Sequence, residues 1–401
     1  MLPFSLLLMF MYSFSFCSVE QKKSSQIESK YSINLDEKKE VSISYSTYFK
    51  NATPIILETN KDCLIGNITE LKIFDGYVYI LDAQSAKSLF VFDLDGRFIR
   101  KIGSLGNGPG EYTQLSNFTL DMENRFIYLL DYFKHLHKYH LDGTFVKTIT
   151  PKVQNNNIIH IQYYNKRLYM RTIGYKPTAS DCMLMEADPD NGDILSKSLP
   201  LKYNKGWAEL IFMGNSFFMP KLNDPPLFTQ MFMDHIVSIG EYITPYIEIK
   251  SKNLVTDKDI SNITEVSGGR DIFQRFNTYL RENSKIFNIN NYVENDEFIF
   301  FMYQQGLMNI NVVIVNKKTE SVVLTQNFIN DLIFKNDENH YFDGFKFSDT
   351  KGAYEILQTR SIVNFLESIR NSEIVPELNK YDKLLNLEDD ANPVIFYYEY
   401  K

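Results

Sequence analysis

A repeated pattern of short strands and tight turns limits what this chain can fold into. In the first copy, the apolar run Tyr77–Asp82 precedes a second run over 89–92 and an Asp95-Gly96 turn. In the second copy, Phe126–Asp131 takes the place of the first run at an offset of 49 residues, and the turn at Gly143 follows Gly96 at an offset of 47. Asp-Gly pairs supply the positive φ values of tight hairpins. Two segments that agree in register indicate a repeat fold of antiparallel strands.

Weaker copies follow over 166–192, 215–232, 297–324 and 343–357. Each copy has room for about four strands, and a repeat of roughly 40–50 residues with four strands is typical of a β-propeller blade. Two segments, 257–287 and 361–387, interrupt the repeat with apolar residues at helical spacing. The remaining length fits about six blades. The sequence therefore predicts an all-β fold, a six-bladed β-propeller with two short helical insertions.

A propeller must join its two ends, because open first and last blades expose strand edges. The apolar C-terminal run after Asn392-Pro393 is suited to this closure. We expect residues 397–400 to pair with early strands near 41–45 or to complete a blade with them.

The N-terminus predicts export. Residues 1–16 carry no charged side chain and are too short to span a bilayer, which takes about 20 residues. They have the character of an export signal, which ends at Cys17. We predict a lipoprotein-type signal peptide over 1–17, a flexible tether over 18–40 that is rich in Ser, Lys, Glu and Gln, and a propeller over 41–401. An ordinary signal peptide, with Cys17 incidental, is the alternative.

Several motifs carry a family likeness. Gly106-Asn107-Gly108-Pro109-Gly110-Glu111-Tyr112, then Ile127 to Asp131, then Tyr139 to Phe145, resemble NHL-type propeller repeats. The C-terminal run 390–398, with the order of segments along the chain, is similar to the six-bladed propeller lipoproteins of Bacteroidetes. The resemblance implies an exported protein anchored through an acylated Cys17 in the envelope of a Gram-negative bacterium, facing the periplasm or the surface. It implies no catalytic residues.

Three carboxylates are candidates for ligand binding. Asp82 and Asp131 end corresponding strands, and carboxylates gathered at the mouth of a propeller channel can bind Ca²⁺, which takes about 6–8 oxygen ligands. A strand-end Asp more commonly caps the following turn. Glu111 follows the glycine-rich loop 103–110, which lacks the Lys-Ser/Thr end of a phosphate-binding loop and is better explained as a crossover between blades. Glu111 can accept hydrogen bonds from the amides of this loop.

Other chemistry-bearing residues are sparse. His135, His137 and His140 lie close together, but a metal site needs three or four converging ligands, and a hairpin rim is the simpler interpretation. Trp207 is the only Trp, suited either to sugar stacking or to core packing. Cys63 and Cys182 are too widely spaced for a metal motif, and either pair in an oxidising compartment or are small buried residues.

The net charge of −8 and the lack of a long basic run argue against a nucleic-acid partner. We therefore expect a non-enzymatic binding or scaffold module in the envelope, with an unknown protein or glycan ligand, no cofactor, and membrane contact through its lipid. The alternative is a calcium-dependent lactonase, lyase or glycan-active enzyme with its site at the channel mouth.

Overall fold

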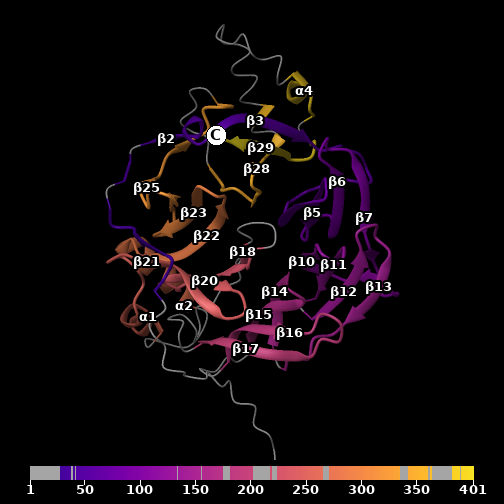
Figure 1. Ribbon diagram of the computed structural model, residues 1–401, viewed down its shortest axis with the longest axis horizontal. Coiled ribbons are helices and arrows are strands. Elements are labelled where there is room, and N and C mark those ends of the chain that lie inside the picture. Colours follow the sequence, from indigo (N-terminus) through magenta and orange to yellow (C-terminus); the bar gives the residue numbers. More distant parts are fainter. Residues whose placement is uncertain are drawn as a thin grey trace, which may run out of the picture.

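The computed structural model describes residues 28–401 except for 38, 41, 133, 155, 175–180, 202–216, 219–223, 265–270, 335–341, 360–361, 364–381 and 389. Most of its strands form six small sheets placed in a ring (Figure 1). The predicted six-bladed propeller is therefore confirmed.

Blades 1, 2, 3 and 5 each consist of four consecutive antiparallel strands, ordered from the axis outward. Blade 1 contains β4 (Glu70–Phe74), β5 (Tyr77–Asp82), β6 (Ser88–Asp93) and β7 (Phe98–Ile102). Blade 2 contains β10 (Leu115–Asp121), β11 (Phe126–Asp131), β12 (His135–His140) and β13 (Phe145–Ile149). Blade 3 contains β14 (Asn156–Tyr164), β15 (Arg167–Gly174), β16 (Cys182–Ala187) and β17 (Ile194–Pro200). Blade 5 contains β22 (Ile286–Glu294), β23 (Phe298–Gln305), β24 (Asn309–Asn316) and β25 (Val322–Thr325).

Blades 4 and 6 also recruit the N-terminal part of the chain. Blade 4 contains β18 (Phe217–Phe218), β19 (Leu227–Phe228), β20 (His235–Ile239) and β21 (Ile243–Lys250), with β1 (Tyr31–Asn34) added in parallel at its outer edge. Blade 6 contains β27 (Phe347–Ser348), β28 (Gly352–Leu357) and β29 (Val394–Tyr400), with β3 (Phe49–Ile56) as its outer strand. The ring is thus closed by an antiparallel pair from the two ends of the chain, as the sequence predicts, although its N-terminal member lies a few residues later than 41–45.

One expectation about the N-terminus is wrong. Residues 31–34 were expected to lie in a flexible tether, but they form β1, because Ile33 is fully buried against blades 4 and 5 and the edge of β21 offers backbone partners. The predicted signal peptide over 1–17 and the part of the predicted tether up to residue 27 lie outside the described residues.

Between β1 and β3 the chain follows the outer edges of blades 4, 5 and 6. Glu40 pairs with Thr325, and β2 (Ile43–Ser44) pairs in parallel with β26 (Phe328–Ile329). The short 3₁₀ helix η1 (Tyr45–Thr47) comes next. We call β1, β2 and η1 the N-terminal strap. A further parallel pair joins β8 (Ser104–Leu105) to β9 (Glu111–Tyr112) between blades 1 and 2.

Successive residues of a strand serve different blade interfaces. In β5, Tyr79 and Leu81 pack toward blade 2, whereas Val78 and Ile80 pack toward blade 6. Six hydrophobic clusters of this kind lie between neighbouring blades around the ring. Because both faces of each sheet are buried, middle strands such as β5, β11 and β24 contain continuous apolar runs rather than an alternating pattern. Truncating a fully buried side chain such as Phe90 to Ala is expected to cost about 3–5 kcal/mol.

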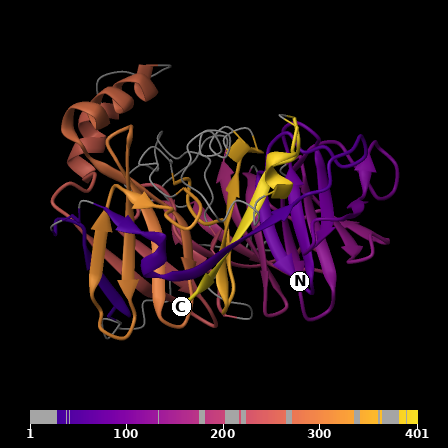
Figure 2. The same ribbon diagram turned by 90° about the horizontal axis from the view of Figure 1, so that it is seen from above.

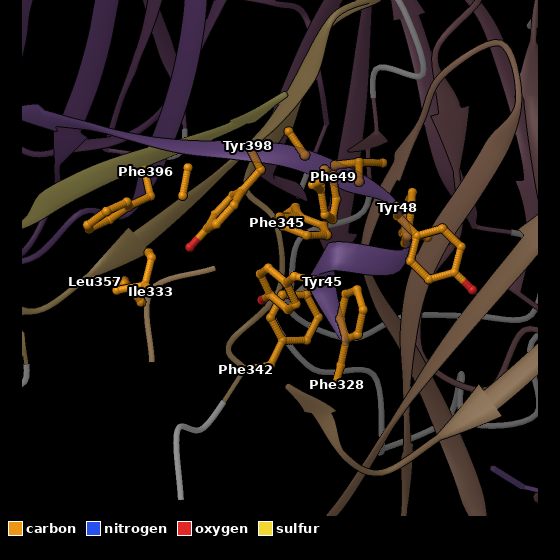
Figure 3. Close-up of a cluster of buried hydrophobic side chains, with 14 of the residues drawn as sticks. Tyr45, Tyr48, Phe49, Phe328, Ile333, Phe342, Phe345, Leu357, Phe396 and Tyr398 are labelled. Atoms are coloured by element: carbon orange, nitrogen blue, oxygen red, sulfur yellow. The ribbon is translucent and has the colours of Figure 1, made fainter. Parts of the chain in front are cut away.

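The interface between blades 5 and 6 is rich in aromatic rings, and the strap supplies part of it. Tyr45 lies among Phe328, Phe345 and Tyr398, with a ring-centroid distance of 4.3 Å to Phe328 (Figure 3). The hydroxyl groups of Tyr45 and Tyr398 both donate to the buried Glu355 carboxylate, at 3.2 and 2.9 Å. The strap and the closing strand β29 are therefore held in one packed unit.

The ring has two different faces. One face holds the loops from each outer strand to the next blade and the loops between second and third strands, and we call it the insertion face. It carries both of the longest connections, 251–285 and 358–393. The first contains α1 (Asp257–Thr264) and α2 (Asp271–Asn283), which stand above the ring in Figure 2, and the second contains α4 (Asp382–Leu385). The opposite face, which we call the turn face, holds the remaining hairpin turns, such as 94–96 and 240–242.

Candidate functional site

Asp82 lies at the end of β5 on the insertion face and is fully buried. One carboxylate oxygen accepts backbone N–H groups of Gly66 and Asn67, at 2.8 and 3.0 Å. The other accepts those of Gln84 and Ser85, at 3.1 and 2.7 Å. The side chain therefore caps the turn after β5 and fixes the loop that enters β4.

Asp131 fixes the loop that enters blade 2. Its carboxylate accepts the backbone N–H of Gln114 at 2.6 Å, together with the backbone N–H and hydroxyl of Thr113. Burial alone raises the pKa of this carboxyl group, but the bonds from Gln114, Thr113 and His137 outweigh burial and hold the pKa below its ordinary value. Both carboxylates bind the loop that enters their blade because they have equivalent places in the repeat, but Asp82 also accepts from its own turn and Asp131 from His137.

Glu111 folds back onto the glycine-rich loop, as the sequence suggests. Its Oε2 accepts the N–H of Gly108 at 2.8 Å. A Cβ atom on Gly106 would lie 2.0 Å from this oxygen, so the carboxylate occupies the space that the glycine leaves open. The loop 103–110 connects blades 1 and 2 and carries β8, which supports its interpretation as a crossover.

The three histidines make separate contacts. His137 is buried and bridges Asp131 and the Thr148 hydroxyl, at 3.3 and 2.9 Å. Because a carboxylate only accepts, Nε2 of His137 carries the proton toward Asp131. His135 contacts Thr150, and His140 lies against the ring of Phe126. Across the residues that the structure describes, no group of three or more His, Cys, Asp or Glu side chains converges as metal ligands would.

The remaining sequence candidates lie apart from these. Cys63 is buried before β4, and Cys182 is buried in β16 of blade 3, so the two are not bonded to each other. Burial raises the pKa of the Cys63 thiol. Cys17 and Trp207 lie outside the described residues.

Polar side chains of the innermost strands link successive blades. Glu70 of β4 accepts from the Asn117 amide at 2.6 Å, and Asn117 in turn accepts the N–H of Ile161 in β14 at 2.9 Å. Thr119 repeats this contact with the N–H of Tyr163 at 3.0 Å. Innermost strands have one unpaired backbone edge facing the axis, and these side chains satisfy part of it.

A group of polar residues from three blades lies near the axis, and two of its members, His160 and Gln230, each have a buried side-chain nitrogen without a hydrogen-bond partner. It comprises Glu70, Lys72, His160, Arg171 and Gln230, and we call it the axial cluster. Lys72 pairs with Glu70 at 2.7 Å, and Arg171 donates from Nε to the Gln230 side-chain oxygen at 3.2 Å. Arg171 and Gln230 are almost fully buried, at 2 and 6% exposed.

Sequence reasoning missed this cluster. Its residues come from blades 1, 3 and 4, and they follow no local motif. The available signal was that Lys72, His160 and Arg171 each stand next to apolar residues in a predicted or possible strand, because a charged or imidazole side chain inside a buried strand needs a partner or a role.

The fold and these contacts define a six-bladed β-propeller that is closed by both chain ends and carries a polar cluster around its axis. Residues 30–399 match the family described as "Domain of unknown function (DUF4934)", and the chain belongs to this family. The resemblance to NHL repeats and to lipoproteins stays a prediction.

Two crystal structures share the fold. One is of a Bacteroides fragilis protein named as exported, similar over 92% of this chain and 99% of its own, with a TM-score of 0.73 and 16% identity. The other is of a member of the DUF4221 family from Bacteroides vulgatus, similar over 88% of this chain and 97% of its own, with a TM-score of 0.50 and 11% identity. No curated protein matches the chain. At these identities the likeness shows the fold alone.

The described residues contain no helix that is both long enough and apolar enough to cross a membrane.

Proposed function

We propose that this protein is an exported, lipid-anchored β-propeller that acts as a binding or scaffold module in the cell envelope. The apolar segment 1–16 that ends at Cys17 supports export and anchoring. The similar Bacteroides fragilis structure, whose protein is named as exported, is consistent with the same compartment.

The observation that carries the binding role is the axial cluster. Buried polar groups in folded proteins are nearly always hydrogen-bonded. Here a side-chain nitrogen of Gln230 and Nδ1 of His160 are buried without a hydrogen-bond partner. Asp82 and Asp131, in contrast, are engaged by backbone amides of their own loops. A ligand therefore gains more at the axis than at the strand-end carboxylates.

The path of the strap suggests how an anchored propeller is oriented. β1 runs parallel to β21, which ends on the insertion face, so the chain before Tyr31 approaches from the turn face. Residues 18–30 reach at most about 45 Å when fully extended. An acylated Cys17 would thus hold the turn face toward the membrane and leave the insertion face directed away from it.

Metabolic labelling tests the anchor. Radiolabelled palmitate should enter the wild-type protein and be lost from Cys17→Ala, while the matched variant Cys63→Ala keeps its label. Cell fractionation should place the wild type in the membrane fraction and release Cys17→Ala from it. Label that persists in Cys17→Ala would reject the lipid anchor.

A further inference from the structure

The axial cluster has the chemistry of a site for an oxyanion. The first reason is the orientation of the Gln230 side-chain amide. The Nε of Arg171 can only donate a hydrogen bond, so the Gln230 atom that faces it at 3.2 Å must be the side-chain oxygen. The other end of the amide is therefore the NH₂ group. This nitrogen is buried and has no hydrogen-bond partner, which leaves a donor available to an acceptor on a ligand.

His160 is the second reason. It lies directly opposite Arg171 in the β14–β15 register, so the two side chains share one face of blade 3. Burial, and after it the nearby cations Arg171 and Lys72, lower the pKa of His160 to about 3. The imidazole is therefore neutral at physiological pH. Glu70, the one carboxylate of the cluster, is held by Lys72 and by Asn117.

The location favours access by a small molecule. Lys72 and Glu70 keep 14% of their side-chain surface exposed, and His160 is only partly buried. The cluster thus combines the buried amide donor of Gln230 and the buried cation Arg171 with one partly open cation, Lys72, which suits a site that takes up an anion and removes it from water.

We propose that the axial cluster binds a small oxyanion, a carboxylate or phosphate group, which accepts a hydrogen bond from the Gln230 amide and is attracted by Lys72 and Arg171. This inference rests on the proposed binding function and names the ligand class for it. The bound anion favours the imidazolium form of His160, so binding raises the pKa of this residue.

Calorimetric titration of the full-length protein in detergent tests the proposal, with sodium galacturonate, inorganic phosphate and sulfate as separate probes. At least one probe should bind in a one-to-one complex, and the preference among them identifies carboxylate or phosphate as the group. Nuclear magnetic resonance of the His160 imidazole should show a higher pKa in the bound form. A site that is merely structural would not change this pKa.

Two variants and a control complete the test. Gln230→Glu places a carboxylate against Arg171 and should weaken binding at least tenfold without loss of the fold, as checked by the melting temperature. Lys72→Gln should weaken binding severalfold, and Lys101→Gln, on the outer strand β7, should leave it unchanged. Absence of binding by every probe, or equal binding by wild type and both axial variants, would overturn the oxyanion site. That result would not bear on the lipid anchor. Persistence of palmitate label in Cys17→Ala, in turn, would reject the anchor and would not bear on the oxyanion site.

Discussion

At the scale of single residues, the side chains with the strongest sequence signal hold the fold together. Asp82 and Asp131 stand out because they end matching strands, and each fixes the entry to its blade through backbone amides. The axial residues stand out less, yet His160 and Gln230 each have a buried nitrogen without a hydrogen-bond partner. Residues at equivalent positions of successive blades, such as Asp82 and Asp131, thus have the same structural role. A ligand site is better sought among polar residues that have no equivalent in the other blades.

The contribution of Asp131 should depend on pH. Its folded-state pKa is lowered by its hydrogen bonds. The stability it provides is therefore complete above its unfolded pKa of about 3.9 and is lost as the pH falls through the lower folded value. Asp131→Asn should lower the melting temperature at pH 7, and the difference from wild type should shrink below about pH 4.

The exposed Asp62→Asn is the control for Asp131→Asn and should show no such difference at either pH. If Asp131→Asn lost as much stability at pH 3 as at pH 7, the carboxylate charge would not be the cause.

At the scale of elements, the closing blade depends on one side chain. Asn392 donates to the carbonyl oxygens of Glu58 and Cys63, both at 2.8 Å, and accepts the N–H of Ile65 at 2.7 Å. Its own N–H donates to the Thr59 hydroxyl. Asn392, two positions before β29, thereby fixes the loop that leaves β3, so that both strands of the closing pair are held by one residue.

Asn392→Asp should destabilise the protein by roughly 3 kcal/mol, because an aspartate cannot donate to the two buried carbonyl oxygens. Chemical denaturation measures this loss. Asn316→Asp is a matched control, since the side-chain oxygen of Asn316 accepts from the backbone N–H groups of Lys318 and Thr319 and an aspartate preserves both bonds. Equal stability of Asn392→Asp and wild type would show that this link does not hold the closure.

Local sequence patterns predicted the middle strands of the blades well. They predicted poorly the innermost strands, such as β22, and the added outer strand β1. The predicted strands Tyr77–Asp82 and Phe126–Asp131 are β5 and β11 of the structure. They were predictable because both faces of each strand are apolar. β22 was missed because its sequence mixes Asn with apolar residues near the axis. β1 was missed because a single buried Ile33 carries it and its partner strand is more than 200 residues away. The axial cluster could not be predicted either, since only the closed ring brings its residues together.

At the scale of the whole molecule, the N-terminal strap and the helical insertions distinguish the two faces of the propeller. The strap enters from the turn face, and the helices stand on the insertion face. An anchored protein should therefore present its helices and the long connections away from the bilayer.

Fluorescence quenching in proteoliposomes can check this orientation. Tyr242 is exposed on the turn face of blade 4, and Met308 is exposed on the insertion face of blade 5. A fluorophore on Tyr242→Cys should be quenched by brominated lipids more strongly than one on Met308→Cys. Stronger quenching at position 308 would reverse the proposed orientation.

The central claim is that this propeller binds a ligand and does not convert it. The direct measurement is mass spectrometry of acidic sugars, lactones and polyuronides after incubation with the purified protein, with and without added Ca²⁺. We predict that a bound compound is recovered unchanged, at no more than one molecule per protein. Conversion of many molecules per protein, dependent on Ca²⁺ and lost in Asp82→Asn or Asp131→Asn, would contradict the account and establish an enzyme.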